Sequence, residues 1–148
     1  ALDEGEKTTS GYPRVVREWK RGTRLEDAPI VFEGQESDVS VGSAVTRSKG
    51  VALEWRSRSY SFYASKRLMR KLPDGVWYDM SKLGVPDDVD MSQYGSSLLL
   101  ELRTEWLGFK SGSLLAVDVD GKLTLMSCSS RHQPRVSSAA LRPKTCSF

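Results

Sequence analysis

Short apolar runs that alternate with polar residues constrain the fold of this chain more than any other feature of its sequence. Across residues 51–56, large apolar side chains recur at every second position, with small or charged residues between them. The same period of two continues over residues 98–106. Such a period places alternate side chains on opposite faces of an extended strand. We therefore expect a half-buried strand at each place, the second with one face formed by Leu98, Leu100, Leu102, Thr104 and Trp106.

Turn sequences connect the apolar runs. Pro73-Asp74-Gly75 separates residues 68–72 from 76–80, and Asp120-Gly121 separates 114–119 from 123–128. Proline presets φ and glycine takes φ > 0 in such turns, and Asp-Gly between apolar runs is a strong hairpin signal. Shorter strands are expected at 30–32, 39–41 and 60–63, whereas 14–20 is either a short helix or a strand and 87–93 is a helical turn or a loop.

These runs amount to about eight strands with tight turns and no strong helical period, which predicts one all-β domain. Consecutive hairpins of this spacing curl into a barrel or pack as a sandwich. The 148 residues suffice for a single domain. We expect an N-terminal arm over residues 1–28, the β domain over 29–130 and a C-terminal tail over 131–148, because both ends are polar and carry prolines or glycines.

Charge is distributed unevenly around a formal net charge of +3. Residues 47–71 contain eight basic residues against one acid, residues 74–90 are mainly acidic, and no acid follows Asp120. A surface polarised in this way suits docking on acidic partner proteins.

Motifs for catalysis or metal binding are missing from the sequence. His132 is the only histidine, so neither a metal site nor a nucleophile with a histidine base is expected. Cys128 and Cys146 form one disulfide or remain two free thiols, with free thiols favoured. No apolar run approaches the roughly 20 residues of a membrane-spanning helix. We therefore expect no enzyme, no cofactor and no membrane span.

Three segments within residues 72–131 resemble a known family: LPDGVWYDMSKLGVP, LLLELRTEWL and LLAVDVDGKLTLMSCSSR. They are similar to lipocalin-like proteins related to bilin lyases of photosynthetic organisms. The matching positions are Leu72, Pro73, Gly75, Trp106, Leu107, Asp118, Gly121 and Lys122. The resemblance implies a single antiparallel up-and-down barrel and an organelle interior, with a plastid favoured over a mitochondrion. It does not imply lyase activity, because the family's opening helix is not evident here.

The resulting functional hypothesis is a non-catalytic linker subunit that docks on acidic proteins of a large assembly, such as a plastid light-harvesting complex of the phycobilisome type. The expected partner-binding residues are Arg56, Arg58, Lys66, Arg67, Arg70, Lys71, Trp19, Trp77 and Phe148. One alternative is a lipocalin-type binder of a pigment or lipid, with a hollow interior lined by Leu98, Leu100, Leu102 and Trp106. A second alternative is a single-stranded nucleic-acid-binding module that exposes Tyr60, Phe62 and Tyr63.

Overall fold

The structure, a computed structural model, describes residues 4–120, 124–127 and 144–145. Two single-turn 3-10 helices, η1 (Glu4–Glu6) and η2 (Leu25–Asp27), accompany eleven strands in this part of the chain. The strands are β1 (Val15–Arg17), β2 (Ile30–Glu33), β3 (Ser40–Ser48), β4 (Val51–Ser59), β5 (Ser65–Lys71), β6 (Tyr78–Asp79), β7 (Asp90–Tyr94), β8 (Ser97–Glu101), β9 (Leu114–Asp118), β10 (Thr124–Ser127) and β11 (Lys144–Thr145). The all-β prediction is confirmed.

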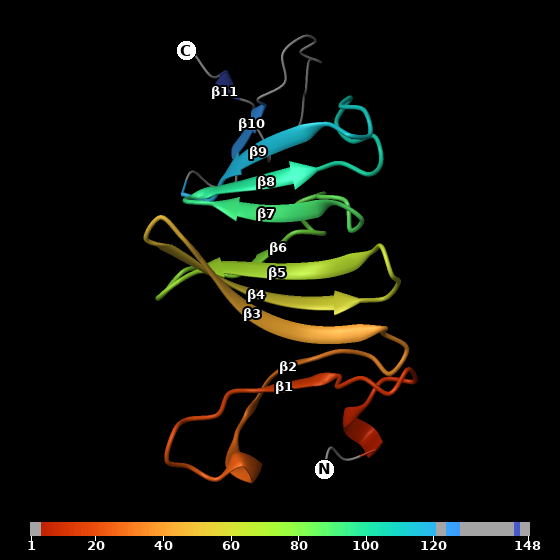
Figure 1. Ribbon diagram of the computed structural model, residues 1–148, viewed down its shortest axis with the longest axis vertical. Helices are drawn as coiled ribbons and strands as arrows, with labels where there is room; N and C mark the ends of the chain where they lie inside the picture. Colours follow the sequence, from red (N-terminus) through yellow and green to blue (C-terminus); the bar gives the residue numbers. More distant parts are fainter. Residues whose placement is uncertain (1–3, 121–123, 128–143, 146–148) are drawn as a thin grey trace.

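The described strands form three sheets that follow one another along the molecule, from β1 at one end to β9 and β10 at the other (Figure 1). Strands β1 and β2 form a two-stranded ribbon. The second sheet has the order β3-β4-β5-β6, and the third has the order β11-β10-β9-β8-β7. All pairings are antiparallel except that of β10 with β11. These sheets are open, so the closed barrel expected from the sequence is not seen among the described strands.

Hairpins account for most of the connections. β3 and β4 pair over nine residues, from Ser40↔Ser59 to Ser48↔Val51, and β5 continues the meander with Leu53↔Lys71 through Ser59↔Ser65. The predicted turn at residues 73–75 does connect β5 to β6, with Leu68 opposite Asp79. Its glycine serves a different purpose from the one expected, because a Cβ on Gly75 would lie 2.2 Å from the backbone oxygen of Lys71. Glycine is needed there for a close approach, and its φ is not positive.

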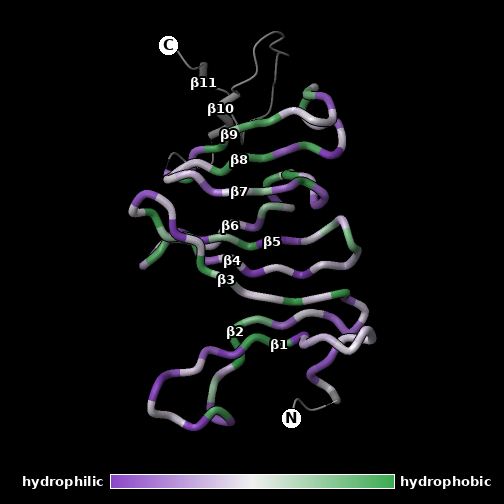
Figure 2. Tube along the Cα trace, in the orientation of Figure 1, coloured by the Kyte–Doolittle hydropathy of each residue, from purple (hydrophilic) through white to green (hydrophobic). Residues whose placement is uncertain are grey.

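The hydrophobic core lies between the β3–β6 sheet and the sheet that begins with β7. Leu53 and Met69 from the first of these sheets pack with Leu98, Leu100 and Leu115 from the second, and all five are buried. Strands β8 and β9 contain hydrophobic segments, whereas the loop between β1 and β2 is largely hydrophilic (Figure 2). This contact between two sheets positions the side chains considered below.

Three local predictions were wrong. Strand β8 ends at Glu101, although Leu102 beyond it is still buried, so the alternation over 98–106 is not one strand. Residues 87–93, expected to be a helical turn or a loop, contain most of β7 (Asp90–Tyr94). Residues 60–63, expected to be a strand, form the turn between β4 and β5. For β7, pairing with β8 overrides the weak local β-propensity, since β-propensity depends on the neighbouring strands.

Within the described residues, no helix has the length and apolar character that crossing a membrane requires.

Candidate functional site

One face of the β3–β6 sheet carries paired charges and is called here the charged face, formed by Glu54, Arg56 and Arg58 of β4 and Arg70 of β5. Alternation along the strands and the direct pairing of Glu54 with Arg70 place these residues on the same side. Arg70 Nε donates to Glu54 Oε2 at 2.7 Å, and Arg56 Nη2 donates to Glu54 Oε1 at 3.3 Å. One carboxylate thus neutralises part of two guanidinium charges.

Trp77 completes this cluster from the segment between β5 and β6. The guanidinium carbons of Arg56 and Arg70 lie 4.4 and 4.8 Å from the centre of its ring. Arg56 Nη1 also donates to the backbone oxygen of Val31, which connects the charged face to β2. The arrangement is a cation–π stack combined with ion pairs, which holds the arginine side chains in fixed positions.

A second ion pair lies at the start of β3. The carboxylate of Asp38 is almost fully buried and accepts hydrogen bonds from Arg58 Nε at 2.8 Å, Arg58 Nη2 at 3.2 Å and the backbone N–H of Gln35 at 2.7 Å. Burial raises the pKa of Asp38, but the hydrogen bonds from Arg58 and Gln35 and the charges of Arg58 and Lys66 outweigh it, so the pKa is lowered. Asp38 is therefore held as a carboxylate in the folded protein.

Lys66 lies opposite Arg58 on the charged face and is exposed. The remaining expected partner-binding residues lie apart from these charges, and Lys71 forms an ion pair with Asp120. Trp19 is half-exposed in the loop between β1 and β2, where its indole N–H donates to Thr23. Arg67 projects from the opposite face of β5, and Phe148 lies outside the described residues. Of the nine expected residues, the structure brings Arg56, Arg70 and Trp77 together.

Opposite the charged face, the β3–β6 sheet presents an inner face toward β7, and a cavity of about 240 Å³ lies there. Its lining residues are Ala44, Thr46, Trp55, Ser57, Arg67, Met91, Ser92 and Gln93. Trp55 Nε1 donates to Thr46 Oγ1 at 2.9 Å, and Gln93 Nε2 donates to the backbone oxygen of Gly95 at 3.0 Å. Sequence reasoning found Arg67 but missed the cavity, because residues from four strands meet only when the two sheets pack together. The sequence feature that could have indicated the cavity is Arg67 itself. This charged residue lies two positions before the buried Met69, and the alternation of the strand places both on the same face.

The structure does not support the binding sites that a lipocalin-type binder or a single-stranded nucleic-acid-binding module would require. Leu98, Leu100 and Leu102 are buried in the packed core, with Trp106 against it, and they do not line a hollow interior. Tyr60, Phe62 and Tyr63 are exposed, but they lie in a turn, and the Tyr60 hydroxyl donates to Asp87 at 3.0 Å.

The described residues contain no histidine and no group of three or more metal-ligating side chains. His132, Cys128 and Cys146 lie outside them. In the described part of the chain, the arrangement can therefore bind and orient charged or apolar groups, while no nucleophile is placed beside a histidine base.

Comparison with known proteins points to peptidases. No protein-family model matches the sequence. A curated protein of Sinorhizobium fredii, "Uncharacterized peptidase y4nA", is 28% identical over 129 residues, which covers 80% of this chain and 17% of that protein. Among solved structures, a post-proline cleaving enzyme from Rickettsia typhi matches 82% of this chain and 18% of its own, with a TM-score of 0.68 and 24% sequence identity. The chain thus spans less than one fifth of the length of either protein.

These matches correct the functional hypothesis drawn from the sequence. The resemblance to lipocalin-like proteins related to bilin lyases is wrong, because one matching protein is named a peptidase and the other a post-proline cleaving enzyme. The non-catalytic linker, the photosynthetic and plastid setting and the expectation that no enzyme is involved are wrong for the same reason. The earlier resemblance depended on turn and strand motifs, which unrelated β-proteins share because the backbone demands the same residues at such turns.

Proposed function

We propose that this chain is a β-sheet segment of a peptidase that cleaves peptides after proline. The observation that carries the proposal is the match of 82% of the chain to less than one fifth of a post-proline cleaving enzyme. A sequence match to a second protein named a peptidase, over 80% of the chain, supports it. The two comparisons use different information, one the amino-acid sequence and the other the arrangement of the backbone.

The geometry of the sheets supports a role beside the chemical step. Meandering antiparallel sheets of about four strands, placed next to one another, are the repeating units of β-propellers. The sheets β3–β6 and β7–β10 have this form. We include in the proposal that they are two neighbouring units of such a repeat, and that the described residues bind and position peptide while the nucleophile comes from elsewhere in the peptidase.

A chimeric enzyme tests this proposal. The segment of the Rickettsia typhi enzyme that matches this chain would be replaced by the chain itself. Cleavage of a peptide with one internal proline would then be followed by mass spectrometry of the products. We expect the chimera to cleave on the carboxyl side of proline at a rate within about tenfold of the parent, because the transplanted sheets supply the same scaffold for loops.

The matched control is the same chimera carrying Leu100→Asp, which places a charge in the core between the sheets and should abolish both folding of the segment and cleavage. A chimera without Leu100→Asp that fails to fold, or that melts like the parent and cleaves nothing, contradicts the proposal.

A further inference from the structure

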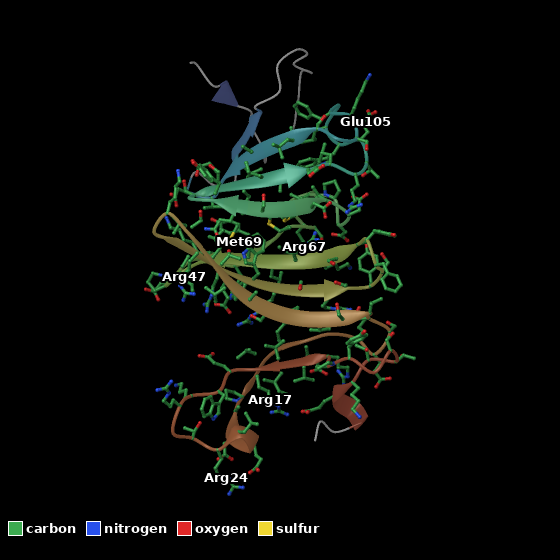
Figure 3. All side chains as sticks on the ribbon, viewed as in Figure 1. Arg17, Arg24, Arg47, Arg67, Met69 and Glu105 are labelled. Carbon is green, nitrogen blue, oxygen red and sulfur yellow. The ribbon has the colours of Figure 1, made fainter. Side chains whose placement is uncertain are left out.

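Arg67 occupies a position on β5 where the alternation of the strand requires a core residue. It lies two residues from the buried Met69, so both side chains project from the inner face of the sheet toward β7 (Figure 3). Its neighbours in register are small: Ser57 is opposite Arg67, and Gly42 is opposite Ser57. A Cβ built on Gly42 meets no atom within 4 Å. Ser57 and Arg67 thus line a space between the sheets, together with Ala44, Thr46 and Trp55 of the neighbouring rows.

The guanidinium of Arg67 has few partners in this space. Its one described hydrogen bond runs from Nη1 to the backbone oxygen of Asp87 at 3.3 Å, and no carboxylate among the described residues lies within ion-pair distance. The two acids whose charges act on Arg67, Asp87 and Asp90, are engaged by other partners. The Asp87 carboxylate accepts hydrogen bonds from Tyr60 and Ser81, and Asp90 pairs with Arg103 at 2.8 Å. Arg56, Arg58 and Arg70 on the charged face, by contrast, each have a carboxylate partner.

Partial burial of an arginine that has no ion-pair partner costs free energy, and an anionic ligand in the cavity would offset that cost. Burial lowers the pKa of Arg67, while Asp90 and Asp87 raise it, and an arginine side chain stays protonated at neutral pH. Its planar guanidinium matches a carboxylate in a bidentate manner.

The remaining walls specify the rest of the ligand. Trp55 and Met91 offer apolar surface, and Ser57 and Ser92 offer hydroxyl groups that can hydrogen-bond an amide. The volume of about 240 Å³ lies below the range of roughly 300–1,000 Å³ that is usual for drug-sized ligands. The cavity therefore holds one or two residues of a ligand.

We propose that this cavity binds the carboxyl end of a short peptide, with its terminal carboxylate on Arg67 and its last side chain against Trp55 and Met91. That the ligand is a peptide rests on the proposed function, because cleavage after proline leaves a peptide with a new carboxyl end. That the ligand carries a carboxylate rests on Arg67 alone.

A pair of probes that differ only in charge tests the proposal on the full 148-residue chain. N-Acetylproline carries the carboxylate, and N-acetylprolinamide replaces it with a neutral amide. Binding of each would be measured by isothermal titration calorimetry. We expect N-acetylproline to bind at least about tenfold more tightly, as a charge-assisted pair with Arg67 predicts. Equal affinity for the two probes, or no binding of either, overturns the proposal.

Three variants locate the site. Arg67→Gln should reduce the affinity for N-acetylproline at least about tenfold and remove the preference over the amide. Lys66→Gln is the matched control, because it removes the same charge from the adjacent residue on the other side of β5 and should leave binding unchanged. Ser57→Leu should narrow the cavity and weaken binding while the chain stays folded, since Ser57 lines the cavity directly opposite Arg67.

Unchanged binding in Arg67→Gln, or an equal loss in Lys66→Gln, overturns the proposal, provided that melting curves show folded protein. The result is distinguishable from that of the chimera, whose readout is cleavage. N-Acetylproline can bind to this chain when the chimera is inactive, and an active chimera requires no occupied cavity.

Discussion

The two faces of the β3–β6 sheet differ in how they are stabilised. The inner face buries Leu53 and Met69 against the leucines of β8 and β9, with Trp55 partly buried beside them. The charged face presents Glu54, Arg56 and Arg58 from the same strand, β4, and these residues rely on ion pairs, on Trp77 and on the backbone of β2. A single strand with a period of two therefore supplies both faces.

This difference determines how each face responds to substitution. Apolar burial is non-directional and scales with area, so the inner face loses stability in proportion to the volume removed. Ion pairs act through specific partners, so the loss of one member leaves the other with an unbalanced charge. The inner face should therefore be sensitive to size, and the charged face to pairing and to pH.

The largest expected loss of stability comes from a substitution at the centre of the inner face. Leu53→Ala should reduce the free energy of unfolding by about 2–5 kcal/mol, because Leu53 is fully buried and the alanine leaves a cavity. Urea denaturation followed by circular dichroism measures this change. Val45→Ala, on the other face of the same sheet and substantially exposed, should cost less than about 1 kcal/mol. Similar losses in the two variants would remove the distinction between the faces.

The second-largest expected loss of stability comes from breaking the ion pair between Asp38 and Arg58. Arg58→Met should cost about 2–3 kcal/mol, at the lower end for a buried pair because Arg58 remains a quarter exposed. The same urea denaturation at pH 7 measures it. Arg24→Met removes the fully surface-located pair with Glu26 and should cost less than about 1 kcal/mol. If both variants lost an equally small amount of unfolding free energy, ion pairing on the charged face would be unimportant for stability.

The smallest effect concerns acid stability. Because the folded protein holds the pKa of Asp38 below its ordinary value, the unfolded chain binds this proton first as the pH falls. The stabilisation by Asp38 is therefore complete above the unfolded pKa, near 4, and is lost as the pH falls through the folded value. Asp38→Asn should lose less stability than the wild type between pH 7 and pH 3, as measured by urea midpoints. A larger acid-induced loss in Asp38→Asn than in the wild type would contradict this sign.

Much of the secondary structure could be predicted because it depends on local signals. The alternation over residues 51–56 and the turn at 73–75 predict strands that the structure contains as β4, β5 and β6. Strand β7 could not be predicted in this way, because its residues, Asp-Met-Ser-Gln-Tyr, have weak β-propensity and are held by pairing with β8.

The candidate site was only partly predictable. Composition singled out the basic residues of β4 and β5, but it could not separate Arg56, Arg58 and Arg70, which have carboxylate partners, from Arg67, which faces the cavity. That separation depends on which face of a strand meets another sheet. The motif resemblance failed because turn chemistry recurs across unrelated folds.

By itself, the sequence determined the all-β class, the hairpins and the two-faced pattern of β4, because these follow from side-chain periodicity and turn residues along one stretch of chain. Only the tertiary structure decided that the strands form separate open sheets, that the acids near Arg67 are engaged by other donors, and that a cavity forms beside Ser57 and Arg67. The physical reason is that each of these features requires residues far apart in the sequence to meet, and local patterns carry no information about which of the available faces will pack together.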